Sequence, residues 1–102
     1  MSYNIVKTNG QPLATVADGQ TNSTATSLTL IGKNYAGYGT FLNENFVKLL
    51  ENFASATAPQ YPLSGQLWWK TDTRLLQVYD TNGNWKTISG AQSLSDAPST
   101  PV

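Results

Sequence analysis

The sequence has neither cysteine nor histidine. The lack of cysteine excludes disulfides, and the lack of both residue types excludes the usual protein sites for zinc and iron. It also removes the side chain that most often serves as the general base of an activated nucleophile. We therefore expect no metal and no cofactor, and we expect that the protein is not an enzyme.

Charge is also scarce, since charged residues make up 12% of the 102 residues and six basic side chains balance six acidic ones. They are scattered, so the basic patch of a nucleic-acid-binding protein is missing. No apolar run approaches the roughly 20 residues that span a bilayer, and the first residues lack the pattern of a signal peptide. We expect neither nucleic-acid binding nor a membrane span.

The first third of the chain predicts β-strands, which we place within residues 1–31. Residues 3–7 and 13–17 alternate between apolar and polar side chains, and the Asn9-Gly10 pair between them is typical of a hairpin turn. A polar loop over 18–24 follows. Residues 26–31 alternate again and predict a third strand.

The periodicity changes to that of a helix over residues 40–54. Thr40 is a plausible N-cap. Glu44, Asn45 and Lys48 are expected on the wetter side. The apolar side chains at helical spacing are Leu42, Phe46, Leu49, Leu50 and Phe53.

Residues 66–89 predict a three-stranded antiparallel meander that holds all three tryptophans. Its strands are 66–70, 75–79 and 84–88, and Asn82-Gly83 forms the second turn. The expected fold is therefore α+β: a small β-rich domain with an N-terminal hairpin, one amphipathic helix and a Trp-rich meander. We assign residues 1–90 to this single domain and residues 91–102 to a Ser/Pro-rich tail or linker.

The aromatic side chains of the meander have two possible roles. Adjacent Trp68 and Trp69 must point to opposite faces of a strand, so one can enter the core while the other needs cover from a neighbouring subunit or stays wet. A wet tryptophan could stack on a sugar ring. The residues expected to form core and subunit contacts are Leu42, Phe46, Leu49, Leu50, Phe53, Trp68, Trp69, Tyr79 and Trp85.

Two weaker patterns leave alternatives open. The phrase Ala-Pro-x-x-Pro-[Leu/Val] occurs at 58–63 and again at 97–102, which is either chance or the trace of a longer repeat array. Glu44 and Glu51 lie seven residues apart on the expected helix. Two carboxylates separated by two turns could serve an inverting glycosidase, although solvated residues beside an apolar stripe explain them more simply.

Most of the chain resembles a known family. The second half reads Pro59-x-x-Pro62-x-x-Gly65-Gln66-Leu67-Trp68-Trp69-x-Thr71-Asp72-Thr73, then Leu76-Gln77-Val78-Tyr79-Asp80 and Asn84-Trp85-Lys86. This order resembles the GxLWYDT…LKVYDGTxW repeat of tail-fibre and baseplate-associated proteins of tailed phages. Segments 28–35 and 39–54 are similar to the amino-terminal part of the same proteins. Lys70 departs from the repeat, which commonly has an acidic or amide residue there.

The resemblance implies a virion structural protein made in the bacterial cytoplasm, often trimeric and without catalysis. We expect an attachment or assembly module that forms a homo-oligomer, with three copies favoured, and that contacts other virion proteins. The alternative is a module that binds carbohydrate or the host surface through Trp69 or Trp85. Position in the particle, host, partner protein and completeness of the chain stay open.

Overall fold

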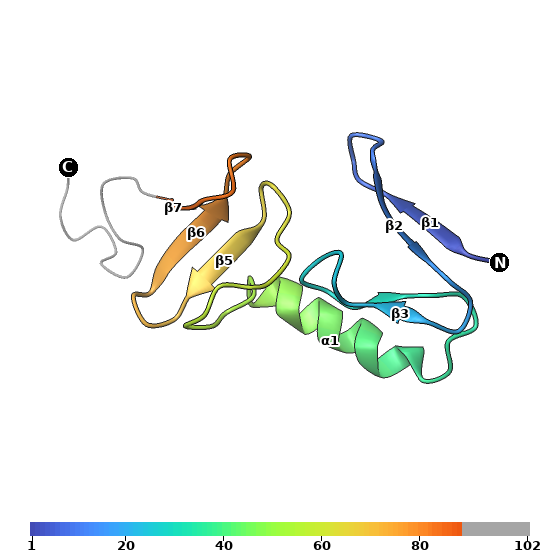
Figure 1. Ribbon diagram of the computed structural model, residues 1–102. Helices are drawn as coiled ribbons and strands as arrows, with labels where there is room; N and C mark the ends of the chain where they lie inside the picture. Colours follow the sequence, from blue (N-terminus) through green and yellow to red (C-terminus); the bar gives the residue numbers. More distant parts are fainter. Residues whose placement is uncertain (89–102) are drawn as a thin grey trace. The chain divides into compact units, whose positions relative to one another are not determined.

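The computed structural model describes residues 1–88. The predicted end of the meander at residue 89, the tail at 91–102 and the second Ala-Pro phrase lie outside the described residues. The chain divides into two compact units, the first Met1–Val47 and the second beginning at Lys48, so that the boundary falls inside the helix (Figure 1). The assignment of residues 1–90 to one domain stays a prediction.

The first unit opens with the predicted hairpin of β1 (Tyr3–Val6) and β2 (Pro12–Val16). The two strands are antiparallel, and Tyr3 lies opposite Val16. A second antiparallel pair, β3 (Thr21–Asn22) and β4 (Leu30–Ile31), leads into α1 (Tyr38–Leu50).

The two Asn-Gly turns that the sequence predicts have the same geometry. In the first, the Lys7 amide donates to the Gln11 carbonyl at 2.9 Å, and in the second the Asp80 amide donates to the Asn84 carbonyl at 2.9 Å. The glycine of each Thr-Asn-Gly triplet has a positive φ, 88° and 87°. A side chain would strain this conformation, so the local sequence is sufficient to specify both turns.

The prediction of a third strand over residues 26–31 is largely wrong, because only β4, at the end of this range, is a strand. The other strand of the pair, β3, falls within the predicted polar loop. Side-chain hydrogen bonds explain the difference. Asn22 Oδ1 accepts from the amides of Thr24 and Ala25 at 3.0 and 2.9 Å, and the buried Thr26 hydroxyl accepts from the Leu28 amide at 3.0 Å. Such local bonds compete with strand ladders for the backbone.

Close packing at Gly32 joins the hairpin to the rest of the first unit. Val16 is the most deeply buried side chain of the described residues, at 2% exposure. A Cβ on Gly32 would lie 3.1 Å from Val16 Cγ1, 2.8 Å from the Gln20 carbonyl oxygen and 2.2 Å from the Ala17 carbonyl oxygen. Two of these three neighbours are backbone atoms, which cannot move aside without disturbing the loop.

Gly32→Ala is therefore expected to lower the free energy of unfolding of the first unit by about 1–3 kcal/mol, as overpacking does elsewhere. Urea unfolding followed by far-UV circular dichroism measures this change. Gly39→Ala is the control, since nothing lies within 4 Å of the added Cβ and alanine favours a helix. Equal stability of the two variants would contradict the packing described for Gly32.

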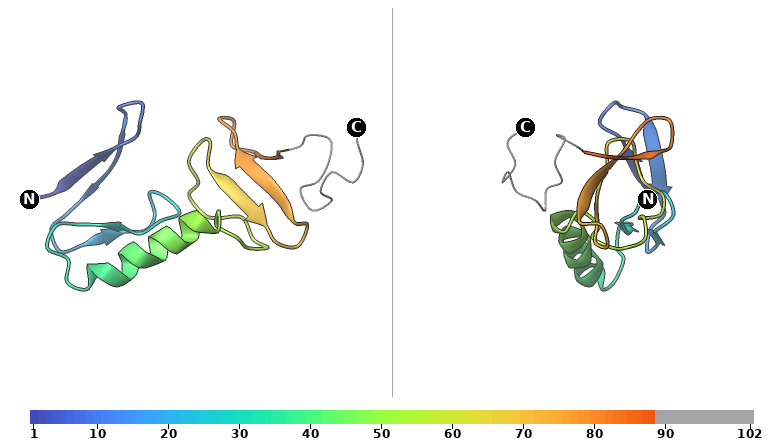
Figure 2. Two further views of the ribbon diagram at one scale, coloured as in Figure 1. Left: turned by 180° about the vertical axis from the view of Figure 1, so that it is seen from behind. Right: turned by 90° about the vertical axis from the view of Figure 1, so that its left-hand side faces the viewer.

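The second unit holds the three-stranded antiparallel meander, which confirms the predicted α+β fold class (Figures 1 and 2). Its strands are β5 (Leu67–Lys70), β6 (Leu75–Tyr79) and β7 (Trp85–Thr87) in that order. The register places Trp68 opposite Gln77, and Gln77 opposite Thr87. Strand positions differ by at most one residue from the prediction at the starts of β5 and β7 and at the end of β7.

The helix covers Tyr38–Leu50 and not the predicted 40–54, so Thr40 lies inside it and is no N-cap. It ends because Asn52 and Phe53 both adopt left-handed φ values, 51° and 55°. The chain then joins the open edge of β5: the Trp69 amide donates to the Asn52 carbonyl at 2.9 Å, and the Ser55 amide donates to the Trp69 carbonyl at 3.2 Å. The apolar periodicity continues to Phe53, but the backbone beyond Leu50 leaves the helix and forms hydrogen bonds with β5.

The Asp80 carboxylate organises the second Asn-Gly turn. Its Oδ1 accepts from the Asn84 and Asn82 amides at 2.8 and 2.9 Å, and Lys86 Nζ lies 3.8 Å from Oδ2. These contacts, led by the Asn84 amide, hold the pKa of Asp80 below its ordinary value.

Because the folded pKa of Asp80 is lowered, its charge stabilises the fold above the ordinary carboxyl pKa of about 4 and loses that effect as pH falls through the folded value. Wild type is expected to be more stable than Asp80→Asn at neutral pH, with the gap closing as the pH falls below the ordinary carboxyl pKa. Urea unfolding monitored by tryptophan fluorescence measures it. Asp72→Asn, in the other turn of the meander, is the control. A gap that does not change with pH would contradict this role.

Candidate functional site

The side of α1 that faces the first unit carries a polar side chain. Asn45 Oδ1 accepts from the Thr29 amide at 3.0 Å, and Asn45 Nδ2 donates to the Thr29 carbonyl at 2.7 Å. One turn earlier, the Phe41 ring lies 5.8 Å from the ring of Tyr35. The expectation that Asn45 lies on the wetter side is therefore wrong, since this side chain is half-buried and fastens the helix to the loop before β4.

The predicted apolar face of the helix is instead open to solvent. Four of its side chains, which we call the helix stripe, are exposed: Leu42 (38%), Phe46 (53%), Leu49 (48%) and Leu50 (82%). No residue of α1 is buried. The expectation that these four residues form a core within one chain is wrong, because the first unit contacts a different side of α1: Thr29 bonds Asn45, and Tyr35 packs against Phe41. Their expected role in subunit contacts stays a prediction.

Phe53 lies beyond the end of α1 and does not continue the stripe as a helical residue. It is half-buried, in the turn that brings the chain to β5. Sequence periodicity alone could not separate it from the stripe, because it falls four residues after Leu49.

The core of the second unit is an aromatic cluster on one face of the meander. Trp68 is 6% exposed, and its Nε1 donates to the Ser55 carbonyl at 3.0 Å. The Trp85 ring packs edge-on against Trp68, with centroids 5.2 Å apart, and lies 4.9 Å from the ring of Tyr79. Edge-on aromatic pairs of this kind stabilise a small core beyond the area they bury.

Trp69 points to the opposite face of β5 from Trp68, as adjacent strand residues must. Both Trp69 and Trp85 are half-buried, and the Trp85 ring is engaged in the cluster. Their use as a sugar-stacking platform stays a prediction, with Trp85 the less available of the two. The second face of the meander also carries Leu67, which is 36% exposed.

The two carboxylates considered for catalysis do not lie on the same helix. Glu44 is exposed on α1, whereas Glu51 is exposed in the turn after the helix ends. Among residues 1–88 there is no group of three His, Cys, Asp or Glu side chains that could hold a metal ion. Nor does this part of the chain contain a helix with the length and apolar character needed to cross a membrane.

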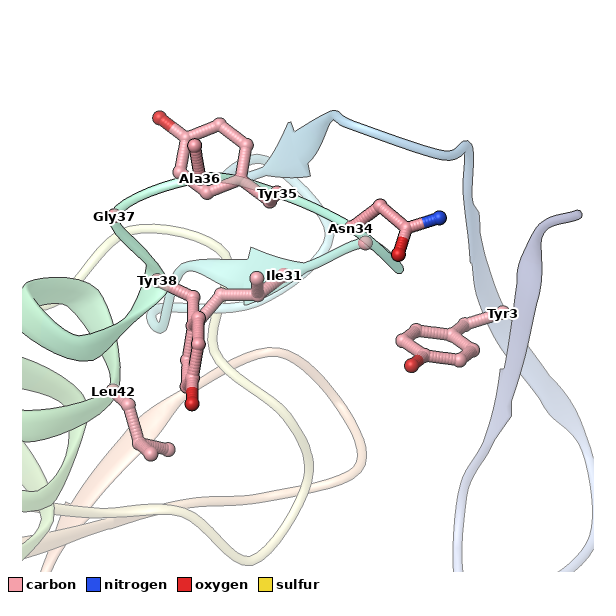
Figure 3. A pocket seen from close by; sticks show the side chains of 9 residues that line it. Tyr3, Ile31, Asn34, Tyr35, Ala36, Gly37, Tyr38 and Leu42 are labelled. Carbon is pink, nitrogen blue, oxygen red and sulfur yellow. The ribbon is translucent and has the colours of Figure 1, made fainter.

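The first unit has a hollow of about 640 Å³ that the sequence did not predict. Figure 3 shows Tyr3 reaching towards it from β1 and Tyr38 from the start of α1, with Asn34 on the loop between. The rest of the wall is Ile31, Gly32, Tyr35, Ala36, Gly37 and Leu42. Not one of the lining residues is charged.

Comparison with known proteins gave no match to a protein family, a curated protein or a solved structure. The likeness to phage tail-fibre proteins therefore stays a prediction.

Proposed function

We propose that this chain is a non-enzymatic structural protein of a phage particle, a tail-fibre-like attachment and assembly module. It associates with copies of itself, three being favoured, and docks onto other virion proteins. The observation that carries the proposal is how little of the chain's apolar surface is covered. Val16 and Trp68 are the buried hydrophobic side chains of residues 1–88.

Apolar burial is the main free-energy gain of folding, and it must offset about 1–2 kcal/mol of backbone entropy per ordered residue. Fully burying one large apolar side chain contributes about 1.5–3 kcal/mol. Two such residues are a small core for a chain of this length. Chains with small cores commonly gain the missing stability from disulfides, metals or association. Without cysteine and histidine, association is the route that remains open to this chain.

The helix stripe is the surface best suited to that association. Its spacing of four and three residues from Leu42 through Phe46 to Leu49 is the spacing of a seam between packed helices. It contains no charge, so copies that meet there bury no unpaired ion. Around a closed symmetry axis every copy presents the same surface, which makes one uncharged stripe sufficient for all contacts.

The number of copies and the place in a virion follow from the resemblance over residues 26–90. Fibre proteins of that kind are often trimers. The low charge and the Trp-rich meander agree with a structural module, and the scattered carboxylates give no support to catalysis.

Recovery of the chain in particles tests the proposed location. An epitope-tagged copy is produced during infection, and particles are purified on a density gradient and analysed by mass spectrometry. Peptides of the chain are expected to co-sediment with tailed particles at a stoichiometry that is a multiple of three. A chain that stays wholly in the particle-free lysate would contradict the proposal.

A further inference from the structure

We propose that the hollow of the first unit, between Tyr3, Asn34 and Tyr38, binds a neutral saccharide. This site differs from the tryptophan platform and lies wholly within residues 3–42. It adds a recognition function to assembly. The hollow of about 640 Å³ lies within the usual range for small-ligand sites, about 300–1,000 Å³.

The two tyrosine rings supply apolar faces of the kind on which sugar rings stack. Tyr3 is 47% exposed and Tyr38 is 58% exposed, so neither ring is buried in the core of the unit. No hydrogen bond among residues 1–88 uses either tyrosine hydroxyl or the Asn34 side-chain amide, and each can therefore bond a ligand hydroxyl (Figure 3).

The walls are held by the packing of the first unit and not by the ligand. Tyr3 lies opposite Val16 in the hairpin, and Val16 is buried against Gly32, which itself lines the hollow. The loop between Asn34 and Gly37 is shaped by left-handed φ values of 63° and 79° at its ends. A wall that is already ordered loses little conformational entropy on binding, which favours a weakly held ligand such as a sugar.

The chemistry of the wall selects among ligands. A phosphate, carboxylate or nucleic acid needs basic side chains, and none lines the hollow. A purely apolar ligand would make no use of the three polar groups. Proline-rich peptides also bind aromatic grooves, but a saccharide with its many hydroxyls uses the Asn34 amide and both tyrosine hydroxyls more fully.

Saccharide binding and assembly are separable. Leu42 borders the hollow and begins the helix stripe, whereas Phe46, Leu49 and Leu50 lie farther along α1 and do not line the hollow. A chain that fails to oligomerise can still bind a sugar, and the reverse also holds.

The experiment is a screen of the intact chain on an array of neutral oligosaccharides, followed by calorimetric titration with the best array member. Tyr3→Ala and Tyr38→Ala are each expected to weaken binding at least tenfold, and Tyr38→Phe is expected to weaken it less because the ring remains. Tyr61→Ala is the matched control, since Tyr61 is 48% exposed but lies in the second unit, and it is expected to leave affinity unchanged.

The fold of each variant is checked by circular dichroism. Absence of binding to every neutral oligosaccharide by the folded wild type would overturn the proposal. So would affinity that survives both alanine replacements or falls equally in Tyr61→Ala. Binding of the peptide Ala-Pro-Gln-Tyr-Pro-Leu at the same tyrosines, without sugar binding, would assign the hollow to proline-rich peptides instead.

Discussion

Phe46→Asp is expected to convert the assembled protein into monomers. Phe46 lies between Leu42 and Leu49 in the helix stripe and is 53% exposed in the single chain. In an assembly closed over the stripe, aspartate would bring one carboxylate per copy into a desolvated centre with no cation to pair with. A loss of at least about 3 kcal/mol, or more than a hundredfold in dissociation constant, is expected. Light scattering after size exclusion measures the change in mass.

Val47→Asp is the matched control for this variant. Val47 is also exposed, at 51%, and lies on the same helix, but it is one position away and outside the stripe. Successive helical residues point about 100° apart, so its carboxylate would remain in water. Equal loss of mass in both variants would show that α1 has no preferred contact face. Retention of the full mass by a folded Phe46→Asp would exclude the stripe as the interface.

Trp68→Ala is expected to unfold or severely weaken the second unit. The substitution empties the centre of the aromatic cluster, removes the edge-on contact with Trp85 and deletes the hydrogen bond to the Ser55 carbonyl. Large-to-small replacement of a buried aromatic costs about 3–5 kcal/mol, a large fraction of the stability of a small domain. The thermal midpoint, followed by near-UV circular dichroism of the remaining tryptophans, should fall by ten degrees or more.

Two variants separate the causes of this loss. Trp69→Ala acts on the adjacent, half-buried side chain and is expected to cost clearly less in the isolated chain. Trp68→Phe keeps an aromatic ring but lacks the indole N–H, so the Ser55 carbonyl keeps only its hydrogen bond from the Thr71 amide, and the loss is expected to be about 0.5–1.5 kcal/mol. If Trp68→Ala and Trp69→Ala were equally stable, the core of the second unit would not lie where the structure has it.

Local chemistry made the meander and the two turns predictable. Each strand of the meander is short and alternating, and the triplet Thr-Asn-Gly at 81–83 accepts the backbone that the turn requires. The strands that pair are consecutive in the sequence, so their pairing needs no contact between distant segments. The same reasoning found the first hairpin, whose turn contains the same triplet.

The orientation of the helix was not predictable, because periodicity shows that a face is apolar and not what covers it. Here two hydrogen bonds between Asn45 and the Thr29 backbone decide which side faces the unit. They join residues 16 positions apart, which no local pattern reveals. The predicted end of the helix was wrong for a similar reason, since the Asn52 carbonyl accepts a hydrogen bond from the Trp69 amide, in a strand far along the chain.

The hollow depends on contacts between distant residues in the same way. Tyr3 and Tyr38 are 35 positions apart, and they line one space in a unit where Val16 of the hairpin packs on Gly32. The glycine-rich stretch between Ile31 and Thr40 is typical of a loop with close backbone packing. Nothing in that stretch pointed to Tyr3.

The solution mass of the intact chain, measured by light scattering after size exclusion at two concentrations tenfold apart, tests the central claim most directly. We expect a stable species of three times the 11.0 kDa of one chain at both concentrations. A folded species of 11.0 kDa at both concentrations would contradict self-assembly through the helix stripe.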